Sequence, residues 1–277
     1  MASYRVTHAI VHDTFREALA RKIFWGLFGL SSLMIVFFLF IMKIDIIEGA
    51  TATVSLFGNT ASRGLDLEKL VRQAQAAIAT FLYTWGMFLA VFASAGLVPS
   101  MLEPGRIELL LSKPVSRAHL LLGRYLGNLV VVGLNIVYLV VGVWLILAVK
   151  TGIWSPDFLV AILTTVFLFA VLLSVVFLVG VAWDSTALAV MIPVGLMILS
   201  PILAQHKIMD RLLSSEWTRQ LWHALYQVLP KVYDLGNMTL RFATDRKVES
   251  WAPVWTSAAF GLAVLAWSVH IFRKRDF

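Results

Sequence analysis

Six long stretches without charged side chains constrain most strongly what this chain can fold into. They cover residues 23–42, 76–102, 125–149, 158–183, 185–205 and 250–272, the last with His270 as its single ionisable residue. A hydrocarbon core about 30 Å thick needs about 20 apolar residues in helical form, because a helix satisfies its backbone hydrogen bonds without water. Each stretch is long enough to cross a membrane as a helix.

The overall composition supports an all-α membrane protein and excludes a soluble globular enzyme. Hydrophobic residues make up 60% of the chain and charged residues 14%, whereas charged residues make up about 25% of soluble proteins. The segments between the six stretches are too short for a separate soluble domain, so we expect a single membrane domain over 1–277. The absence of Cys excludes disulfide bonds, thiolate metal sites and cysteine nucleophiles.

The positive charges indicate a partner and an orientation. The formal net charge is +7, but the basic residues lie between the apolar stretches and form no single patch. Membrane lipid is therefore the expected partner, and nucleic acid is not. Basic residues at 21–22, 124 and 273–275 lie at the ends of stretches and favour a cytoplasmic location for both termini. The first stretch is longer than the apolar part of a secretory signal, so we interpret it as a retained helix.

Two segments outside the stretches have amphipathic helical patterns. Residues 1–22 are expected to form a helix in the membrane interface, with a simple positively charged lead into the first span as the alternative. Residues 206–249, the long outer loop, contain a second amphipathic helix that Ser215 can cap and Pro230 ends. This helix rests at the outer interface or packs over the spans as a lid, and the sequence leaves both arrangements open.

Residues 103–127 form the densest cluster of charges and turn residues in the chain, EPGRIELLLSKPVSRAHLLLGRYLG. The pattern predicts a short helix, a break, and a second helix that continues into the third span. The break falls at Lys113-Pro114, because the residue before a proline is disfavoured in a helix, and Ser116 can cap the second helix. A short helix attached to the ends of two spans can receive a push from a partner and transmit it.

This segment resembles the permease subunits of ATP-binding-cassette (ABC) transporters of the second exporter type. The resemblance is carried by Gly105, by ELLLSKP at 108–114, by Ser116-Arg117 and by LGRYLG at 122–127. It extends over the whole chain through the interfacial helix, the six spans and the long outer loop before the last span. Arg106 stands where the family often has threonine, and Pro104 precedes the glycine, which affects the expected start of the short helix. The closest branch includes permeases linked to copper-enzyme maturation and gliding motility.

The resemblance implies a division of labour between subunits. Two permease subunits, identical or different, pair in the inner membrane of a bacterium, and two separate ATPase subunits dock on the short cytoplasmic coupling helix. The residues that the resemblance assigns to ATPase coupling are Glu103, Gly105, Arg106, Glu108, Lys113, Pro114, Arg117 and Asp184. The charged ones are expected to form salt bridges, Gly105 and Pro114 to shape the turn, and Asp184 to make a smaller second contact. Plain solvation at the headgroup surface is the alternative role for each charge.

No cofactor or metal site is expected in this chain. It contains no G-x-x-x-x-G-K-[ST] phosphate-binding loop, so ATP hydrolysis must occur in a separate subunit and the chain itself is not an enzyme. His8 and His12 have the spacing of metal ligands on a helix but lack a third ligand, and the nine Met include no Met-x-x-Met pair.

The absence of charge within the spans indicates the cargo. Proton-coupled transporters and ion channels keep costly buried charges for their ions, so the sequence disfavours both classes. It predicts an ATP-driven export permease that moves an apolar or amphipathic cargo or acts mechanically at the membrane. A non-transporting membrane anchor or assembly subunit of a larger complex is the alternative.

Overall fold

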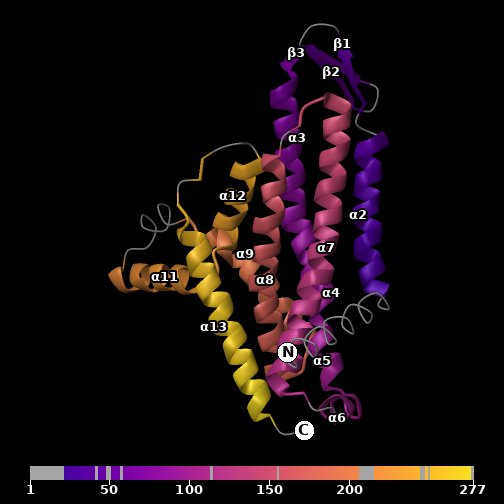
Figure 1. The fold of residues 1–277 in the computed structure, drawn as a ribbon. Coiled ribbons are helices and arrows are strands. Elements are labelled where there is room, and N and C mark those ends of the chain that lie inside the picture. Colours follow the sequence, from indigo (N-terminus) through magenta and orange to yellow (C-terminus); the bar gives the residue numbers. More distant parts are fainter. Residues whose placement is uncertain are drawn as a thin grey trace.

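The chain folds into a bundle of long helices that run roughly side by side (Figure 1). The computed structural model describes residues 22–40, 43–47, 51–56, 59–112, 115–154, 156–205, 215–243, 247–248 and 250–275. The expected interfacial helix over 1–22 lies outside these residues, apart from its last position.

Six apolar helical segments correspond to the six predicted spans. They are α2 (Lys22–Phe40), the run from α3 to α5, α7 (Arg117–Thr151), α8 (Asp157–Trp183), α9 (Thr186–Leu203) and α13 (Ala252–Lys274). The second run consists of α3 (Leu67–Phe81), a π-helical turn (Leu82–Gly86), α4 (Met87–Ala95) and α5 (Leu97–Leu102). Five segments are long and apolar enough to span a membrane, and α2 contributes the shorter apolar stretch Phe24–Phe37 among the described residues. The prediction of a helical membrane protein is confirmed.

Local sequence signals set the helix ends. Ser116 caps α7, because its hydroxyl oxygen accepts a hydrogen bond from a backbone N–H three residues later at 3.3 Å. Ser185 caps α9 in the same way at 3.4 Å, and Asp184 before it has a left-handed backbone with φ of 51°. Pro253 lies in the first turn of α13, where its missing N–H costs nothing. The predicted cap at Ser116 is therefore confirmed, whereas Ser215, the expected cap of the helix within 206–249, precedes the helix Glu216–Val228 without a side-chain capping hydrogen bond.

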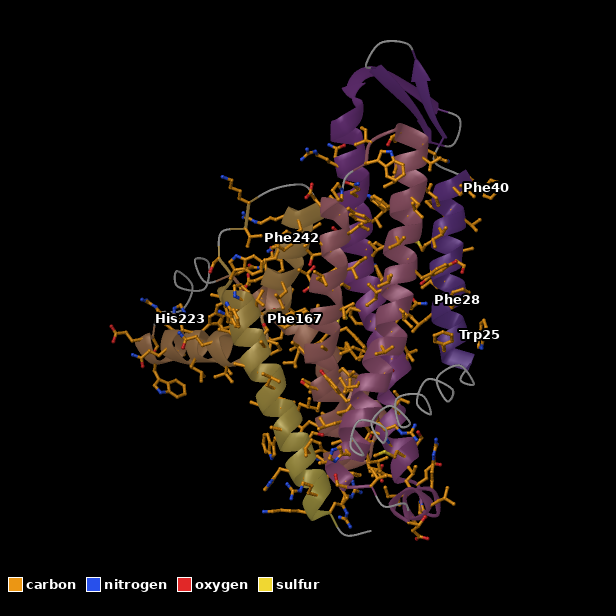
Figure 2. All side chains as sticks on the ribbon, in the orientation of Figure 1. Trp25, Phe28, Phe40, Phe167, His223 and Phe242 are labelled. Carbon is orange, nitrogen blue, oxygen red and sulfur yellow. The ribbon has the colours of Figure 1, made fainter. Side chains whose placement is uncertain are left out.

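Helix α8 forms the centre of the bundle. Several of its side chains are completely buried, among them Phe158 and Phe169, and it packs against α4, α7, α9, α12 and α13. Peripheral helices expose apolar side chains instead. On α2, Trp25 and Phe40 (Figure 2) are 59% and 68% exposed. Phe28 instead stacks on the ring of Tyr138 on α7, with ring centroids 4.9 Å apart. A bundle that is apolar both inside and outside fits a lipid environment.

A small antiparallel sheet, which the sequence pattern did not predict, lies between α2 and α3 at one end of the bundle (Figure 1). Its strands are β1 (Lys43–Ile47), β2 (Thr51–Leu56) and β3 (Asn59–Asp66), in the order β1-β2-β3. In the β1–β2 pairing, Lys43 lies opposite Ser55. In the β2–β3 pairing, a bulge interrupts the register between Ala52 and Val54. The sequences of β1 and β2 are rich in Ile, Thr and Val, which suit strands. Helix α3 follows β3 directly and begins well before the predicted start of the span at 76.

The segment 206–249 contains two described helices: the first is the expected amphipathic helix between Ser215 and Pro230, and the second was not predicted. Helix α11 (Glu216–Val228) has no buried residue and extends sideways from the bundle (Figure 1), so it does not cover the spans as a lid. Helix α12 (Val232–Ala243) belongs to the core, because Val232, Leu235 and Met238 are at most 4% exposed. Its many polar residues conceal this buried stripe in the sequence.

Two serines of neighbouring spans fix the start of α12. The first N–H groups of a helix have no partner within the helix. Here the N–H of Lys231 donates to the hydroxyl oxygen of Ser257 on α13, and the N–H of Tyr233 donates to that of Ser200 on α9, each at 3.0 Å. Both serines are buried. Helix α12 is thus capped by two other helices and tied to both.

Polar contacts also join α11 to α12. The hydroxyl of Tyr226 donates a hydrogen bond to the Asp234 carboxylate at 2.5 Å, and the Lys231 ammonium group lies 4.5 Å from the centre of the Tyr226 ring. Burial and the hydrogen bond to Asp234 raise the pKa of Tyr226 above its ordinary value. The hydroxyl therefore stays protonated near neutral pH and continues to donate.

Replacing Ser257 with alanine is expected to lower the free energy of unfolding by about 1–2 kcal/mol, because the Lys231 N–H loses its acceptor inside the bundle. Thermal unfolding in detergent measures this loss. Ser268→Ala is the matched control, since Ser268 is equally buried on α13 and its hydroxyl has no hydrogen-bond partner among the described residues. An equal loss of stability in both variants would contradict the capping role.

Candidate functional site

The short helix α6 (Arg106–Leu111) lies beyond the end of α5, at the end of the bundle opposite the sheet (Figure 1). The turn between α5 and α6 is closed by the carbonyl of Glu103, which accepts hydrogen bonds from the backbone N–H groups of Arg106 at 3.1 Å and Ile107 at 3.2 Å. Gly105 has φ of +80°, a conformation that other residues adopt only with strain. A glycine at this position therefore sets the direction in which α6 leaves α5.

Helix α6 has apolar side chains on two sides. Ile107 is 3% exposed, and Leu110 packs against the hydrophobic core. Leu109 is 65% exposed, because successive residues are rotated by about 100° and positions 107 and 109 point in nearly opposite directions. The sequence interpretation missed Leu109. The signal that would have identified Leu109 is its position in a short helix with charged residues, where it lies on the side opposite the apolar residue Ile107.

The charged side chains of this region have different surroundings. Glu103 and Glu108 are exposed. Arg106 is half-buried and donates a hydrogen bond to the backbone carbonyl of Ser100 at 3.3 Å. This carbonyl belongs to the last turn of α5, where carbonyl groups lack partners within the helix. Arg106 therefore stabilises the α5–α6 turn from within the chain.

Arg117 and Asp184 lie in a second cluster, around the end of α13. Arg117, at the start of α7, donates hydrogen bonds to the backbone carbonyls of Arg273 at 3.3 Å and of Arg275. The Arg275 guanidinium group donates to the carbonyl of Val181 at 2.5 Å and pairs with the Asp184 carboxylate at 3.6 Å. An ion pair this exposed contributes about 1 kcal/mol or less. Together these contacts connect the start of α7, the α8–α9 turn and the end of α13.

The structure thus separates the predicted coupling residues into groups. Glu103, Gly105, Arg106 and Glu108 belong to the α5–α6 turn and α6, Arg117 and Asp184 belong to the cluster at the end of α13, and Lys113 and Pro114 lie outside the described residues. Helix α6 and the end of α13 lie at the same end of the bundle (Figure 1). Arg117 and Asp184 have partners within the chain, and their role in coupling to an ATPase stays a prediction.

The arrangement suits a mechanical role. Among the described residues, no group of three or more His, Asp and Glu is placed to hold a metal ion. Helix α5 lies close against α8, because Gly180 of α8 has no side chain: a Cβ there would lie 2.8 Å from the Cβ of Val98. A displacement of α6 would therefore move α5 and, through this close contact, the central helix of the bundle.

One comparison with known proteins places the chain in a family. A family model described as "ABC-2 family transporter protein" matches residues 8–277, so the match covers all six spans and both clusters at the α6 end. No curated protein matches the chain. The narrower likeness to permeases linked to copper-enzyme maturation and gliding motility stays a prediction.

Proposed function

Because this chain belongs to the ABC-2 family of transporter proteins, we propose that it couples ATP hydrolysis by a separate ATPase subunit to movement of an apolar or amphipathic molecule, or to mechanical work at the membrane. Family membership makes the chain a permease component of an ABC transporter, and its apolar helices make it an integral membrane protein that crosses the bilayer several times. The coupling, the cargo and the partners are the parts that we propose.

The exposed face of α6 is the observation that carries the proposal. This face consists of Glu108 and Leu109, with Leu109 65% exposed, and the exposed Glu103 of the α5–α6 turn precedes it. The opposite face is anchored to the core through Ile107. A leucine exposed to water gains free energy when a partner covers it. Flanking carboxylates orient a partner that carries basic groups. The ATPase surface that docks here is therefore expected to be an apolar hollow with a basic rim.

The orientation follows from the distribution of positive charge. Arg106, Arg117 and residues 273–275 all lie at the α6 end of the bundle. Because basic residues close to the ends of spans favour the cytoplasmic side, we place this end and both termini in the cytoplasm of a bacterium, with the sheet on the opposite side of the inner membrane. A second permease chain, identical or different, completes the membrane part of the complex.

The interior of the bundle supports an uncharged cargo. Apart from Arg124, which is 5% exposed near the start of α7, the buried hydrogen-bonding side chains of the described residues are hydroxyls and amides, and many of them bond to the backbone. Tyr125 donates to the carbonyl of Ala170 at 2.8 Å, and Thr165 donates to that of Ala161 at 2.7 Å. A cation that entered this interior would lose its hydration without gaining a carboxylate partner, because no Asp or Glu is buried among the described residues.

Co-purification with a co-expressed ABC ATPase, which we expect to be encoded beside this chain, tests the proposal. The amount of ATPase that co-purifies with the double variant R106A/E108A is expected to be about one tenth of the amount that co-purifies with the unmodified permease. The two substitutions remove one charge-assisted contact and weaken the α5–α6 turn. Glu216→Ala is the control, because Glu216 is also exposed at the start of a helix but lies on α11.

Two results would reject parts of the proposal. Undiminished ATPase binding by R106A/E108A would reject the docking site. A complex that assembles but shows the same ATP turnover as the isolated ATPase, in every lipid composition, would instead support a non-transporting anchor.

A further inference from the structure

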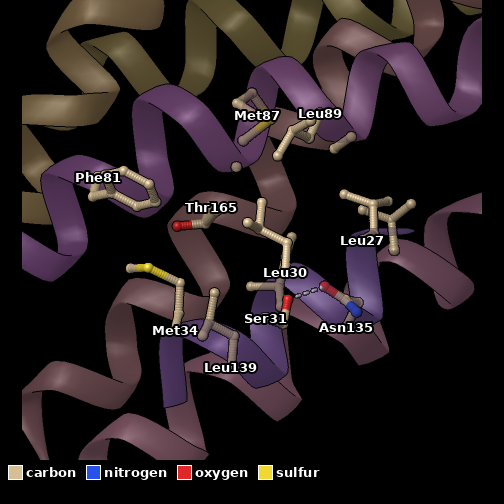
Figure 3. A pocket seen from close by; sticks show the side chains of 14 residues that line it. Leu27, Leu30, Ser31, Met34, Phe81, Met87, Leu89, Asn135, Leu139 and Thr165 are labelled. Carbon is tan, nitrogen blue, oxygen red and sulfur yellow. Dashed lines mark hydrogen bonds between the residues drawn. The ribbon is translucent and has the colours of Figure 1, made fainter. Parts of the chain in front are cut away.

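A cavity of about 40 Å³ lies between α2, the π-helical turn with α4, α7 and α8 (Figure 3). Most of its wall is apolar, with Leu30 and Met34 from α2, and Phe81 and Leu89 from the second span. The described lining side chains carry no charge. The wall includes Gly86, the last residue of the π-helical turn, and such turns are frequent at functional sites.

The polar side chains of the wall are Ser31, Asn135 and Thr165, and the Thr165 hydroxyl already donates to the carbonyl of Ala161 at 2.7 Å. The Ser31 hydroxyl donates a hydrogen bond to Asn135 Oδ1 at 2.9 Å (Figure 3). Asn135 Nδ2 is buried and has no hydrogen-bond partner among the described residues. Leaving a buried amide N–H unsatisfied costs about 1–3 kcal/mol. This group therefore favours an occupant that brings an acceptor oxygen.

The position of the cavity indicates where such an occupant comes from. Ser31 and Asn135 lie near the middle of the stretches 23–42 and 125–149, far from both membrane surfaces. Leu30 and Phe81 line the cavity and are also 37% and 39% exposed on the outside of the bundle. The cavity is therefore accessible from the side that faces hydrocarbon, and a charged ligand would find no counter-charge in it.

We propose that this cavity is a subsite for the oxygen-bearing end of an uncharged amphipathic molecule that enters from the hydrocarbon phase. Its hydroxyl or carbonyl oxygen accepts a hydrogen bond from Asn135 Nδ2. A cavity needs about 10–15 Å³ to hold one water-sized group, so 40 Å³ accommodates a hydroxyl or carbonyl group, and the apolar chain lies outside along Leu30 and Phe81. The identification of this molecule as the transported cargo rests on the proposed function. Its binding in the cavity is independent of that function.

Photolabelling of the full-length permease in nanodiscs tests the subsite. The probes are a dodecanol with a diazirine close to its hydroxyl and the dodecane with the same diazirine. The alcohol is expected to label peptides containing Met34, Phe81 or Leu89 several-fold more than the alkane.

Asn135→Leu is expected to reduce labelling by the alcohol about tenfold, which corresponds to one hydrogen bond. Ala90→Leu, which fills the cavity from its wall, should reduce labelling by both probes.

Asn128→Leu is the matched control. Asn128 lies two turns away on α7, is also buried with Nδ2 unpaired among the described residues, and does not line the cavity. Equal labelling by alcohol and alkane, or an equal loss in the Asn128 and Asn135 variants, would overturn the proposal. Absence of labelling with both probes would also overturn it and leave water as the occupant. Normal labelling of a permease that binds no ATPase would reject the proposed function and leave the subsite standing.

Discussion

Replacing Leu109 with aspartate is expected to weaken binding of the partner ATPase about 30-fold or more. The leucine is 65% exposed, and covering it contributes about 2 kcal/mol. Aspartate loses this contribution and adds a charge that must be desolvated beside Glu108. The affinity of the purified ATPase for permease in nanodiscs, measured by biolayer interferometry, gives the change directly.

The folded state of the permease should not change in this variant, because Leu109 contacts water and Ile107 provides the anchor. Leu221→Asp is the control: Leu221 is 45% exposed on α11, outside the α6 end. It should bind the ATPase with unchanged affinity. If both variants bind normally, α6 is not the docking element and the proposed coupling route fails.

Replacing Gly180 with alanine is expected to destabilise the permease by about 1–3 kcal/mol, in the range of overpacked cores. The added Cβ would lie 2.8 Å from Val98 Cβ and 3.1 Å from Val98 Cγ1. Val98 is 1% exposed, so neither residue can move without separating α5 from α8. Thermal unfolding followed by size-exclusion fluorescence measures the loss.

Gly195→Ala is the matched control for this prediction. Gly195 also lies within a span, on α9, but a Cβ there meets no atom within 4 Å. Because alanine favours a helix over glycine by about 1 kcal/mol, this variant should be as stable as the unmodified chain or slightly more so. Equal stability of the two variants would show that the α5–α8 contact is not tight. A lower ATP turnover in the assembled Gly180 variant would connect the contact to coupling.

Several features of the fold could be read from the chain because they depend on neighbouring residues alone. The length of the apolar stretches located the spans, because the thickness of the bilayer sets the length of a helix that crosses it. Ser116 marked a helix start through its ability to accept a hydrogen bond from a nearby N–H. The short helix after the second span was visible as a concentration of Pro, Gly and charge, whereas the predicted break at Lys113-Pro114 lies outside the described residues.

Other features depend on residues that are distant in the sequence. Helix α12 reads as a polar loop, and its burial depends on Ser200 and Ser257 of other helices accepting its first N–H groups. The sequence assigned Arg117 and Asp184 to contacts with an ATPase or to plain solvation, yet both contact Arg275 at the end of α13. Neither the periodicity nor the composition of the sequence indicates such contacts between distant residues.

The sequence by itself determined that this protein is a bundle of apolar helices with a charged, broken segment at one end, because helix formation in a membrane requires only local hydrogen bonds and sufficient apolar length. Only the tertiary structure decided that Leu109 points outward, that Gly180 brings α5 against α8, and that Asn135 faces a cavity. Each of these depends on which helices pack together and at what rotation, and that choice is made by side-chain shape across the whole bundle.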